Sequence, residues 1–367
     1  MTRRFLPTLA ALTVFLAAVA ALTVGVWSYG YRQALDQLAQ RGEADLTLAA
    51  DRLTGQLQLY QQMAVLMSDH PGLDARAPRD LLLEAADKTA ALDVMLVDGQ
   101  GRVVSAANGT DSPDLSRRTF FRRAMQGALG EEHGLNPMTG QRAYYFAAPR
   151  FDAAGRTAGA LVVVANIDRV EAEWRGARPA VFFTDRTGQV FITNRSELLF
   201  WRQGAAGLRP PGGEETEFAT RTVGRHTVWI ENWSPYVPSR ALHLSRDLPV
   251  IGMTAQALID VGPARRLAGL QAASLAAMLL AFGAILFWLI GRRRVLAVAN
   301  QRLESRVAER TAELSTANEQ LRREVAERLA AEQALKKAQD DLVQAGKLSA
   351  LGQMSAGISH ELNQPLM

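Results

Sequence analysis

One histidine beside a glutamate, close to the carboxyl end of the chain, is the strongest chemical signal in the sequence. His360 and Glu361 belong to a run in which five residues, four of them apolar, share one helix face by their spacing; they are Leu348, Leu351, Ser355, Ile358 and Leu362. At about 100° per residue a helix turns His360 almost opposite to this series, so its imidazole should be exposed beside a carboxylate. Such a pair suits proton transfer or nucleophilic attack. It does not suit zinc, because the spacing His-Glu-x-x-His fails at Gln364.

The composition excludes several other kinds of chemistry. The 367 residues include no cysteine, which rules out disulfides, thiolate metal sites and cysteine nucleophiles. The formal charge is only +4, from 41 basic and 37 acidic residues, and the excess is scattered, so we expect no nucleic-acid partner. At about 150 residues per domain, the length predicts roughly two to three folded units.

Two uncharged apolar runs predict two transmembrane helices. The first covers residues 5–31 and the second residues 267–290, and about 20 apolar residues suffice to cross a hydrocarbon core of roughly 30 Å. The flanking arginines are Arg3 and Arg4 before the first run, and Arg292, Arg293 and Arg294 after the second. The positive-inside rule therefore puts residues 1–4 and 292–367 in the cytoplasm and residues 32–266 outside. A cleaved signal peptide is the alternative for the first run, and a buried helix for the second.

The exported segment begins with a helix and continues with strands. Leucines at helical spacing predict one long helix over residues 32–71, which a Pro-Gly pair ends. Two later stretches share a strand, an Asp-x-x-Gly turn and a second strand, since Asp can cap such a turn and Gly can adopt positive φ. The aspartates of these turns are Asp98 and Asp185, and Asp152 begins a third turn. The repeat predicts two α+β modules, residues 72–176 and 177–255; the alternative is that a common turn recurs by chance.

This layout resembles the double Cache family, in which two PAS-like modules follow a long helix that rises from a membrane span. In that family the membrane-distal module binds a small ligand, with contributions from an Arg-x-Tyr-Phe-like motif. Residues Arg118 to Phe121, Arg-Thr-Phe-Phe, match this motif with Phe in place of Tyr, and Gln141–Phe146 resembles the pocket strand that follows. The resemblance implies that Arg118 holds a carboxylate by a bidentate ion pair and that Phe121 contributes to the pocket. Tyr144 or Tyr145, on alternate faces of the strand, would donate a hydroxyl.

Two observations leave the ligand open. Arg118 belongs to an arginine cluster with Arg117, Arg122 and Arg123, and most such arginines are only solvated. Carboxylate-binding relatives commonly add a lysine on the late strand, whereas residues 161–166 contain none. The sequence therefore predicts a small extracytoplasmic ligand, with a carboxylate such as a dicarboxylate as the candidate, and does not identify it.

Residues 295–345 are rich in Ala, Glu, Arg, Leu and Gln and repeat every seven positions. The apolar positions of the first seam are Val307, Leu314, Leu321, Leu335 and Leu342. A helix with such a stripe cannot bury it alone, so the pattern predicts a coiled coil. Because it continues from a membrane span, a parallel homodimer is the simplest assembly; a long solvated helix is the alternative.

Residues 346–367 closely resemble the phosphoacceptor box of sensor histidine kinases, above all of the four-carbon dicarboxylate transport sensor kinases. The matching residues are Leu-Ser-Ala-Leu-Gly-Gln-Met-Ser-Ala-Gly and Ser-His-Glu-Leu-Asn-Gln-Pro-Leu. The resemblance implies that His360 attacks the γ-phosphate of ATP, bound with Mg²⁺, while Glu361 accepts the Nδ1 proton. The phosphoryl group would then pass to an aspartate of a response regulator. Gln364 stands where phosphatase-active relatives often have Asn or Thr, and Pro365 predicts a helix kink.

The sequence thus predicts a dimeric α+β membrane protein, an inner-membrane sensor histidine kinase with a periplasmic double Cache domain. Because the chain stops soon after His360, we expect the ATP-binding domain to lie outside it, which would make this a catalytically incomplete fragment. The rival from another class is a chemoreceptor, which shares the spans and the Cache domain but not the histidine box. A third interpretation, an anchored solute-binding or adhesion domain, leaves the coiled coil unexplained.

Overall fold

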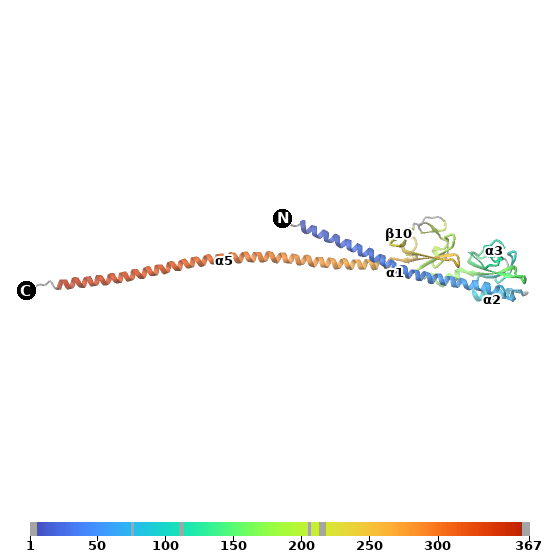
Figure 1. Ribbon diagram of the computed structural model, residues 1–367, viewed down its shortest axis with the longest axis horizontal. Coiled ribbons are helices and arrows are strands. Elements are labelled where there is room, and N and C mark those ends of the chain that lie inside the picture. The colour runs from blue at the N-terminus through green and yellow to red at the C-terminus, as the bar shows by residue number, and fades with distance from the viewer. Residues whose placement is uncertain (1–5, 75–76, 110–113, 205–206, 213–217, 362–367) are drawn as a thin grey trace, which may run out of the picture. The chain divides into compact units, whose positions relative to one another are not determined.

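The computed structural model describes residues 6–74, 77–109, 114–204, 207–212 and 218–361, without the side chains of residues 6–8, 350 and 352–361. The chain divides into two compact units between Met278 and Leu279. The first unit contains a long helix, two main antiparallel sheets and the start of a second long helix (Figure 1). The second unit is the remainder of that helix.

Two very long helices flank the sheets in the sequence. α1 runs from Leu6 to Ser68 and α5 from Gly262 to Glu361. Each has a proline in its first turn, where the missing N–H is not needed, and none in its interior. Both helices are long and apolar enough to cross a membrane. The span expected over residues 5–31 and the helix expected after it therefore form one continuous element.

Two antiparallel sheets pack along α1. The distal sheet, which packs on the carboxyl-terminal part of α1, has the order β2-β1-β5-β4-β3, and the proximal sheet has the order β10-β11-β12-β13-β6-β7. The distal strands are β1 Asp93–Asp98, β2 Val103–Ala106, β3 Gly130–Leu135, β4 Arg142–Phe151 and β5 Thr157–Asn166. The proximal strands are β6 Ala180–Thr184, β7 Val190–Thr193, β10 Ala219–Val223, β11 His226–Ile230, β12 Arg240–Leu248 and β13 Met253–Asp260, beside a small ribbon of β8 Arg202–Gly204 and β9 Gly207–Arg209. The short helices are η2 Pro71–Asp74, α2 Arg79–Thr89, α3 Thr119–Met125, α4 Ile167–Ala172 and η3 Ser196–Leu198.

Three hairpin turns share one hydrogen-bond pattern, which confirms the turns predicted from Asp-x-x-Gly. In each, the Asp Oδ1 atom accepts two backbone N–H groups and the Gly N–H donates to the Asp carbonyl; the glycines are Gly101, Gly155 and Gly188, with φ of +87°, +76° and +76°. A second likeness follows two of the turns. The amide of Asn108 donates to the Leu92 carbonyl, and that of Asn194 donates to the Pro179 carbonyl. Both bonds hold the residue that precedes the first strand of a sheet.

The second sheet extends beyond the boundary expected at residue 255. β13 continues to Asp260 because it pairs with β12 along its whole length and with β6. Its central residues are Ala255, Gln256 and Ala257, all fully buried. Small and polar residues in that stretch weaken the alternation of large apolar side chains that marks a strand in a sequence.

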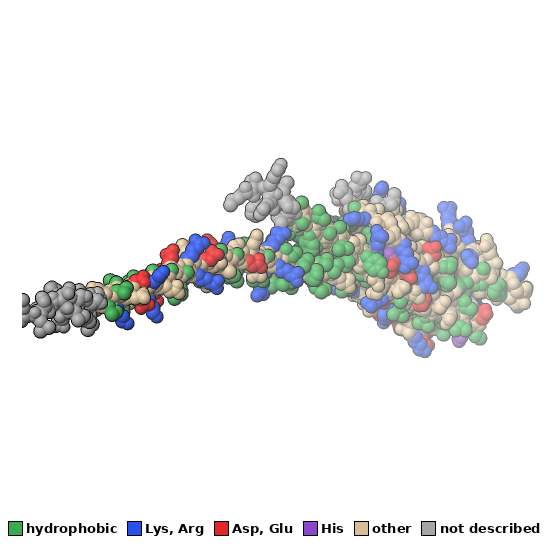
Figure 2. All heavy atoms as spheres, turned by 60° about the vertical axis from the view of Figure 1, so that its left-hand side comes forward, with side chains coloured by type: hydrophobic (Ala, Val, Ile, Leu, Met, Phe, Trp, Pro, Cys, Tyr) green, Lys and Arg blue, Asp and Glu red, His purple; other side chains and the backbone are tan. Residues whose placement is uncertain are grey.

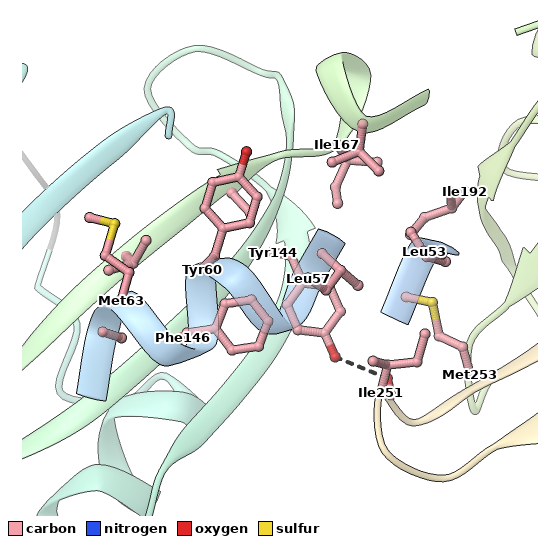
Figure 3. Close-up of a cluster of buried hydrophobic side chains, with 14 of the residues drawn as sticks. Leu53, Leu57, Tyr60, Met63, Tyr144, Phe146, Ile167, Ile192, Ile251 and Met253 are labelled. Carbon is pink, nitrogen blue, oxygen red and sulfur yellow. Dashed lines mark hydrogen bonds between the residues drawn. The ribbon is translucent and has the colours of Figure 1, made fainter. Parts of the chain in front are cut away.

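A single hydrophobic core joins α1 to both sheets. Figure 3 shows Leu53 and Leu57 of α1 among side chains from the distal sheet, including Tyr144 and Phe146, and from the proximal sheet, including Ile192. Since side chains alternate along a strand, the other face of β4 contributes to a separate core under α3. The distal sheet is therefore covered on both faces, by α1 on one side and by α3 on the other.

Gly42 lets α1 lie close to the proximal sheet. A Cβ atom added there would come within 1.9 Å of Ile259 Cδ1 and 2.8 Å of Leu244 Cδ1. Gly42→Leu therefore overpacks this contact, and we expect it to lower the free energy of unfolding by about 1–3 kcal/mol. Thermal unfolding of the purified chain, followed by tryptophan fluorescence, measures the change. Gly55→Leu on the same helix is the control, because nothing lies within 4 Å of its Cβ position; equal losses in both variants would contradict close packing at Gly42.

The second unit is a helical segment with exposed side chains. Every residue from 292 to 349 is exposed, including the seam residues Leu314 and Leu342 at 71% and 72%. Figure 2 shows hydrophobic side chains scattered among basic and acidic ones along this part of α5. Exposed leucines at heptad spacing are what one strand of a coiled coil presents without its partner.

Candidate functional site

A cavity of about 640 Å³ opens on the distal sheet, on the side that α3 covers. Arg118 and Tyr145, two of the residues predicted to bind ligand, both line it. Further polar groups come from Asp93, Asn108, Asp114, Asn136 and Gln141. These residues lie on separate strands and loops, so the fold alone brings them to one place.

Arg118 is held in position rather than simply solvated. It precedes α3 with an extended backbone, and its guanidinium lies over the rings of Phe120 and Tyr145, at 5.5 and 5.1 Å from their centres. Its Nε atom lies 3.0 Å from Glu132 Oε1. The other oxygen of Glu132 accepts the N–H groups of Thr119 and Phe120 at the start of α3. The backbone of α3 therefore holds the Glu132 carboxylate in place, and the carboxylate in turn holds the Arg118 guanidinium. A guanidinium fixed in this way is ready for bidentate binding.

Tyr145 presents a hydroxyl without a partner. Its side chain is 3% exposed, and its ring stacks on Phe120 with centres 5.0 Å apart. No hydrogen bond reaches the hydroxyl from the described part of the chain. Burial raises the pKa of Tyr145, although the nearby Arg118 opposes this, so the hydroxyl keeps its proton and can donate. An unpaired buried hydroxyl costs about 1–3 kcal/mol, a cost that a ligand acceptor would remove.

Asp93 and Asn108 belong to the cavity although the sequence did not indicate them as ligand-binding. Asp93 Oδ1 accepts the backbone N–H groups of Val94 and Asn108 at 2.8 and 3.2 Å. Burial raises the pKa of the Asp93 carboxyl, against the opposing effect of these N–H donors. Asn108 follows the turn at Asp98 as Asn194 follows the turn at Asp185, and each side-chain amide holds the residue that precedes a strand. This likeness indicates a structural role for Asn108 and gives no sign of a binding site.

Phe121 and Tyr144 lie away from this cavity. Phe121 is 3% exposed and packs in the core under α3. Tyr144 is on the face of β4 opposite to Tyr145, and its hydroxyl donates to the Ile251 carbonyl at 2.9 Å (Figure 3). Ile251 precedes β13, so this bond joins the distal sheet to the proximal one. Of the two tyrosines left open by the sequence, Tyr145 is the one that lines the cavity.

A buried ion-pair network on the Tyr144 side also joins the sheets. Arg142 Nη1 donates to Glu171 Oε1 at 2.6 Å and to the Phe191 carbonyl at 2.8 Å, while Nη2 donates to Glu171 Oε2 at 2.6 Å and to Asp168. Arg142 and Glu171 are only 5% and 3% exposed. Burial disfavours the charged guanidinium, but the two carboxylates more than compensate and raise the pKa of Arg142. Because Phe191 lies in β7, the network connects β4 to the proximal sheet.

Adjacent residues in β3, in β4 and just before β4 face the cavity and the junction in alternation. The pairs, cavity side first, are Glu132 and His133, Gln141 and Arg142, and Tyr145 and Tyr144. His133 completes the junction side, with Nε2 at 3.3 Å from Asp185 Oδ2. Successive side chains on a strand point to opposite faces, so the same strands form one wall of the cavity and one side of the junction.

His360 and Glu361 lie at the carboxyl-terminal end of α5. Their side chains are outside the described residues, and so are Gln364 and Pro365 entirely. The helical backbone through Glu361 agrees with the helix that the apolar spacing predicts. The chemistry of the pair stays a prediction.

The chain is similar to two curated sensor proteins along most of its length. It is 32% identical over 358 residues to the C4-dicarboxylate transport sensor protein DctB of Pseudomonas aeruginosa, which covers 90% of this chain and 57% of that protein. It is 30% identical over 393 residues to the protein of the same name from Rhizobium meliloti, with coverage of 92% and 60%. This chain therefore spans less than two thirds of the length of these relatives.

One solved structure supports the fold independently. The sensor domain of the V. cholerae histidine kinase DctB superposes with a TM-score of 0.50 at 20% identity, covering 61% of this chain and 98% of that domain. No protein-family model matches the chain. The two sheets therefore have the fold of that domain, and this agrees with the Cache-like architecture that the sequence resemblance implies.

Proposed function

We propose that this chain is the sensing part of a sensor histidine kinase. Its similarity to the two DctB proteins and to the DctB sensor domain supports a DctB-like sensor protein with a DctB-type Cache sensor domain. In this proposal the two sheets lie in the periplasm and α1 and α5 cross the inner membrane. A small carboxylate binds in the distal cavity. Its binding shifts the equilibrium between two arrangements of the long helices, and α5 carries the change toward His360.

The proposal depends on one observation: the guanidinium of Arg118, which Glu132 holds in place, and the unpaired hydroxyl of Tyr145 belong to the same cavity. Arg118 can form two parallel hydrogen bonds to a carboxylate, and Tyr145 can donate a further one. A neutral apolar ligand would leave both groups unsatisfied. The cavity therefore favours an anionic oxygen acceptor small enough for about 640 Å³.

The contact between the two long helices supports a path from the sheets to the membrane. Tyr31 and Leu35 of α1 pack with Ala264 and Ala268 of α5. A Cβ atom on Gly30 would lie 2.9 Å from Gln271 Oε1 and 3.8 Å from Ala268 Cβ, so the missing side chain permits the close approach. Small residues commonly allow such contacts between membrane helices.

The kinase part of the proposal rests on the His360 region and on the length of the relatives. Those proteins are long enough to hold a further domain, which would bind ATP and Mg²⁺. His360 would attack the γ-phosphate, Glu361 would accept the imidazole proton, and an aspartate of a response regulator would receive the phosphoryl group. The exposed heptad seam of α5 supports a parallel homodimer as the working assembly.

Calorimetric titration of the full chain in lipid nanodiscs tests the sensing part. The probes are mono- and dicarboxylates with and without an amino group. We expect Arg118→Gln to weaken the best-binding probe roughly 10–100-fold, because a charge-assisted hydrogen bond contributes about 1.5–3 kcal/mol. Arg117→Gln is the matched control, since its side chain is exposed and does not line the cavity. Unchanged affinity in Arg118→Gln would refute the pocket assignment.

A further inference from the structure

The charges that line the distal cavity are mixed. Among the residues that the structure describes, Arg118 is the one lining side chain with a positive charge, and Glu132 already lies 3.0 Å from it. Two carboxylates, Asp93 and Asp114, line the same cavity. A dianionic ligand would therefore meet one guanidinium, itself paired, together with two acidic side chains.

Asp93 and Asp114 are held differently. Asp114 is exposed and accepts the Ser116 N–H at 2.8 Å, an interaction that lowers its pKa. Asp93 is half-buried at the start of β1. Among the residues that the structure describes, no arginine, lysine or histidine nitrogen lies within 4.0 Å of its carboxylate. Two backbone N–H groups reach this partly desolvated carboxylate, but it lacks the opposite charge that buried carboxylates ordinarily have beside them.

We infer that the ligand carries a protonated nitrogen as well as a carboxylate, with Arg118 binding the carboxylate and Asp93 binding the nitrogen. The inference rests on the proposed function and assigns the ligand class: a small zwitterion of the amino-acid type. An ammonium group beside Asp93 supplies the missing counter-charge and donates charge-assisted hydrogen bonds. The second carboxylate of a dicarboxylate would instead lie beside Asp93, where like charges repel.

The buried hydroxyl of Tyr145 supports the same polarity. The Arg118 guanidinium lies over the Tyr145 ring, 5.1 Å from its centre, and the Tyr145 hydroxyl can donate to the carboxylate that Arg118 binds. The cation-binding and anion-binding groups of the cavity are therefore separate residues, as a ligand with two opposite charges requires.

Matched ligand pairs test the inference by calorimetry on the full chain in lipid nanodiscs. γ-Aminobutyrate and succinate have four carbons each and differ in one terminal group, which is ammonium in the first and carboxylate in the second. β-Alanine and malonate form the corresponding three-carbon pair. L-Alanine tests a ligand whose ammonium and carboxylate are attached to the same carbon. We expect an amino-bearing probe to bind more tightly than its dicarboxylate partner. Asp93→Asn keeps an oxygen for the Val94 and Asn108 N–H groups but removes the charge, and it should weaken the amino-bearing probe roughly 10–100-fold.

Asp51→Asn on α1 is the control, because it removes the same charge from an exposed side chain that does not line the cavity. The affinity of this variant for the amino-bearing probe should stay close to that of the unchanged chain. The inference would be overturned if succinate or malonate bound more tightly than its amino-bearing partner and Asp93→Asn left the affinity unchanged or raised it. If Arg118→Gln still weakened binding in that case, the proposed function would stand. Binding that neither substitution affects, or no binding of any probe, would overturn both. If Asp93→Asn unfolds the chain, the preference within each matched pair, measured on the unchanged chain, decides the question alone.

Discussion

Replacing Arg142 by methionine is expected to lower the free energy of unfolding of the sensor region by about 3–5 kcal/mol, since it leaves the carboxylate of Glu171 buried without its cation. Glu171 is 3% exposed and accepts hydrogen bonds from Nη1 and Nη2 of the guanidinium, each at 2.6 Å. Methionine fills much of the arginine volume, so the loss reports the charge rather than a cavity. Denaturant unfolding of the purified chain measures the change.

Two comparisons isolate the buried network. Arg52→Met breaks the ion pair with Glu173, whose side chains are 52% and 56% exposed, and should cost less than about 1 kcal/mol. The double variant Arg142→Met with Glu171→Met should regain most of the loss, because it removes both buried charges. A double variant no more stable than Arg142→Met would show that the ion pair is not the cause.

Tyr144→Phe, which removes the hydrogen bond to the Ile251 carbonyl, should lower the free energy of unfolding by about 0.5–1.5 kcal/mol.

Changing His360 to glutamine, in a protein that joins this chain to an ATP-binding domain, is expected to abolish phosphoryl transfer from radiolabelled ATP. A glutamine amide nitrogen is not a nucleophile, whereas a neutral imidazole is. Glu361→Gln keeps the nucleophile but removes the proton acceptor, and should slow the reaction roughly 10²–10⁴-fold. The label is followed on gels after acid and after alkali, since a phosphorus–nitrogen bond is labile only in acid.

Ser359→Ala is the matched control for this experiment. It changes the residue before His360 and leaves the imidazole and the carboxylate in place. We expect its label to match that of the unchanged protein. Acid-labile label that persists in His360→Gln would assign the phosphoacceptor to another histidine, of which the chain has four.

Local rules account for the parts of the fold that the sequence predicts. The turn beginning at Asp98 forms as expected because the carboxylate and Gly101 act within a few residues of each other. The long helices likewise follow from uninterrupted runs without proline. The boundary at residue 255 was placed too early, because β13 depends on pairing with distant strands and carries small residues in its centre.

The site depends more on contacts between distant residues. Arg118 and Tyr145 were found through a family resemblance, and the alternation along β4 could not decide between Tyr144 and Tyr145. Alternation identifies the inward residue only where one face of a sheet meets water, and here α1 and α3 cover both faces. Asp93 was missed because it reaches the cavity through the pairing of β1 with β5, which no short spacing reveals.

Arg142 illustrates the same limit for the junction between the sheets. A charged residue at the start of a strand is ordinarily exposed. Here Glu171 of α4 and the Phe191 carbonyl of β7 enclose it, and both come from later parts of the chain. The sequence indicates the charge but not the partners that bury it.

Hydrogen exchange of the full chain in nanodiscs, with and without the tightest-binding probe, tests most directly the claim that ligand binds in the distal cavity. We predict that ligand slows exchange in residues 93–97, 115–121 and 141–146, which contain or adjoin the lining residues. A second cavity, of about 960 Å³, lies at the proximal sheet and is lined in part by Arg178, Arg195 and Trp233. Protection confined to residues 232–239 of that second cavity, with unchanged exchange around Arg118 and Tyr145, would contradict the account.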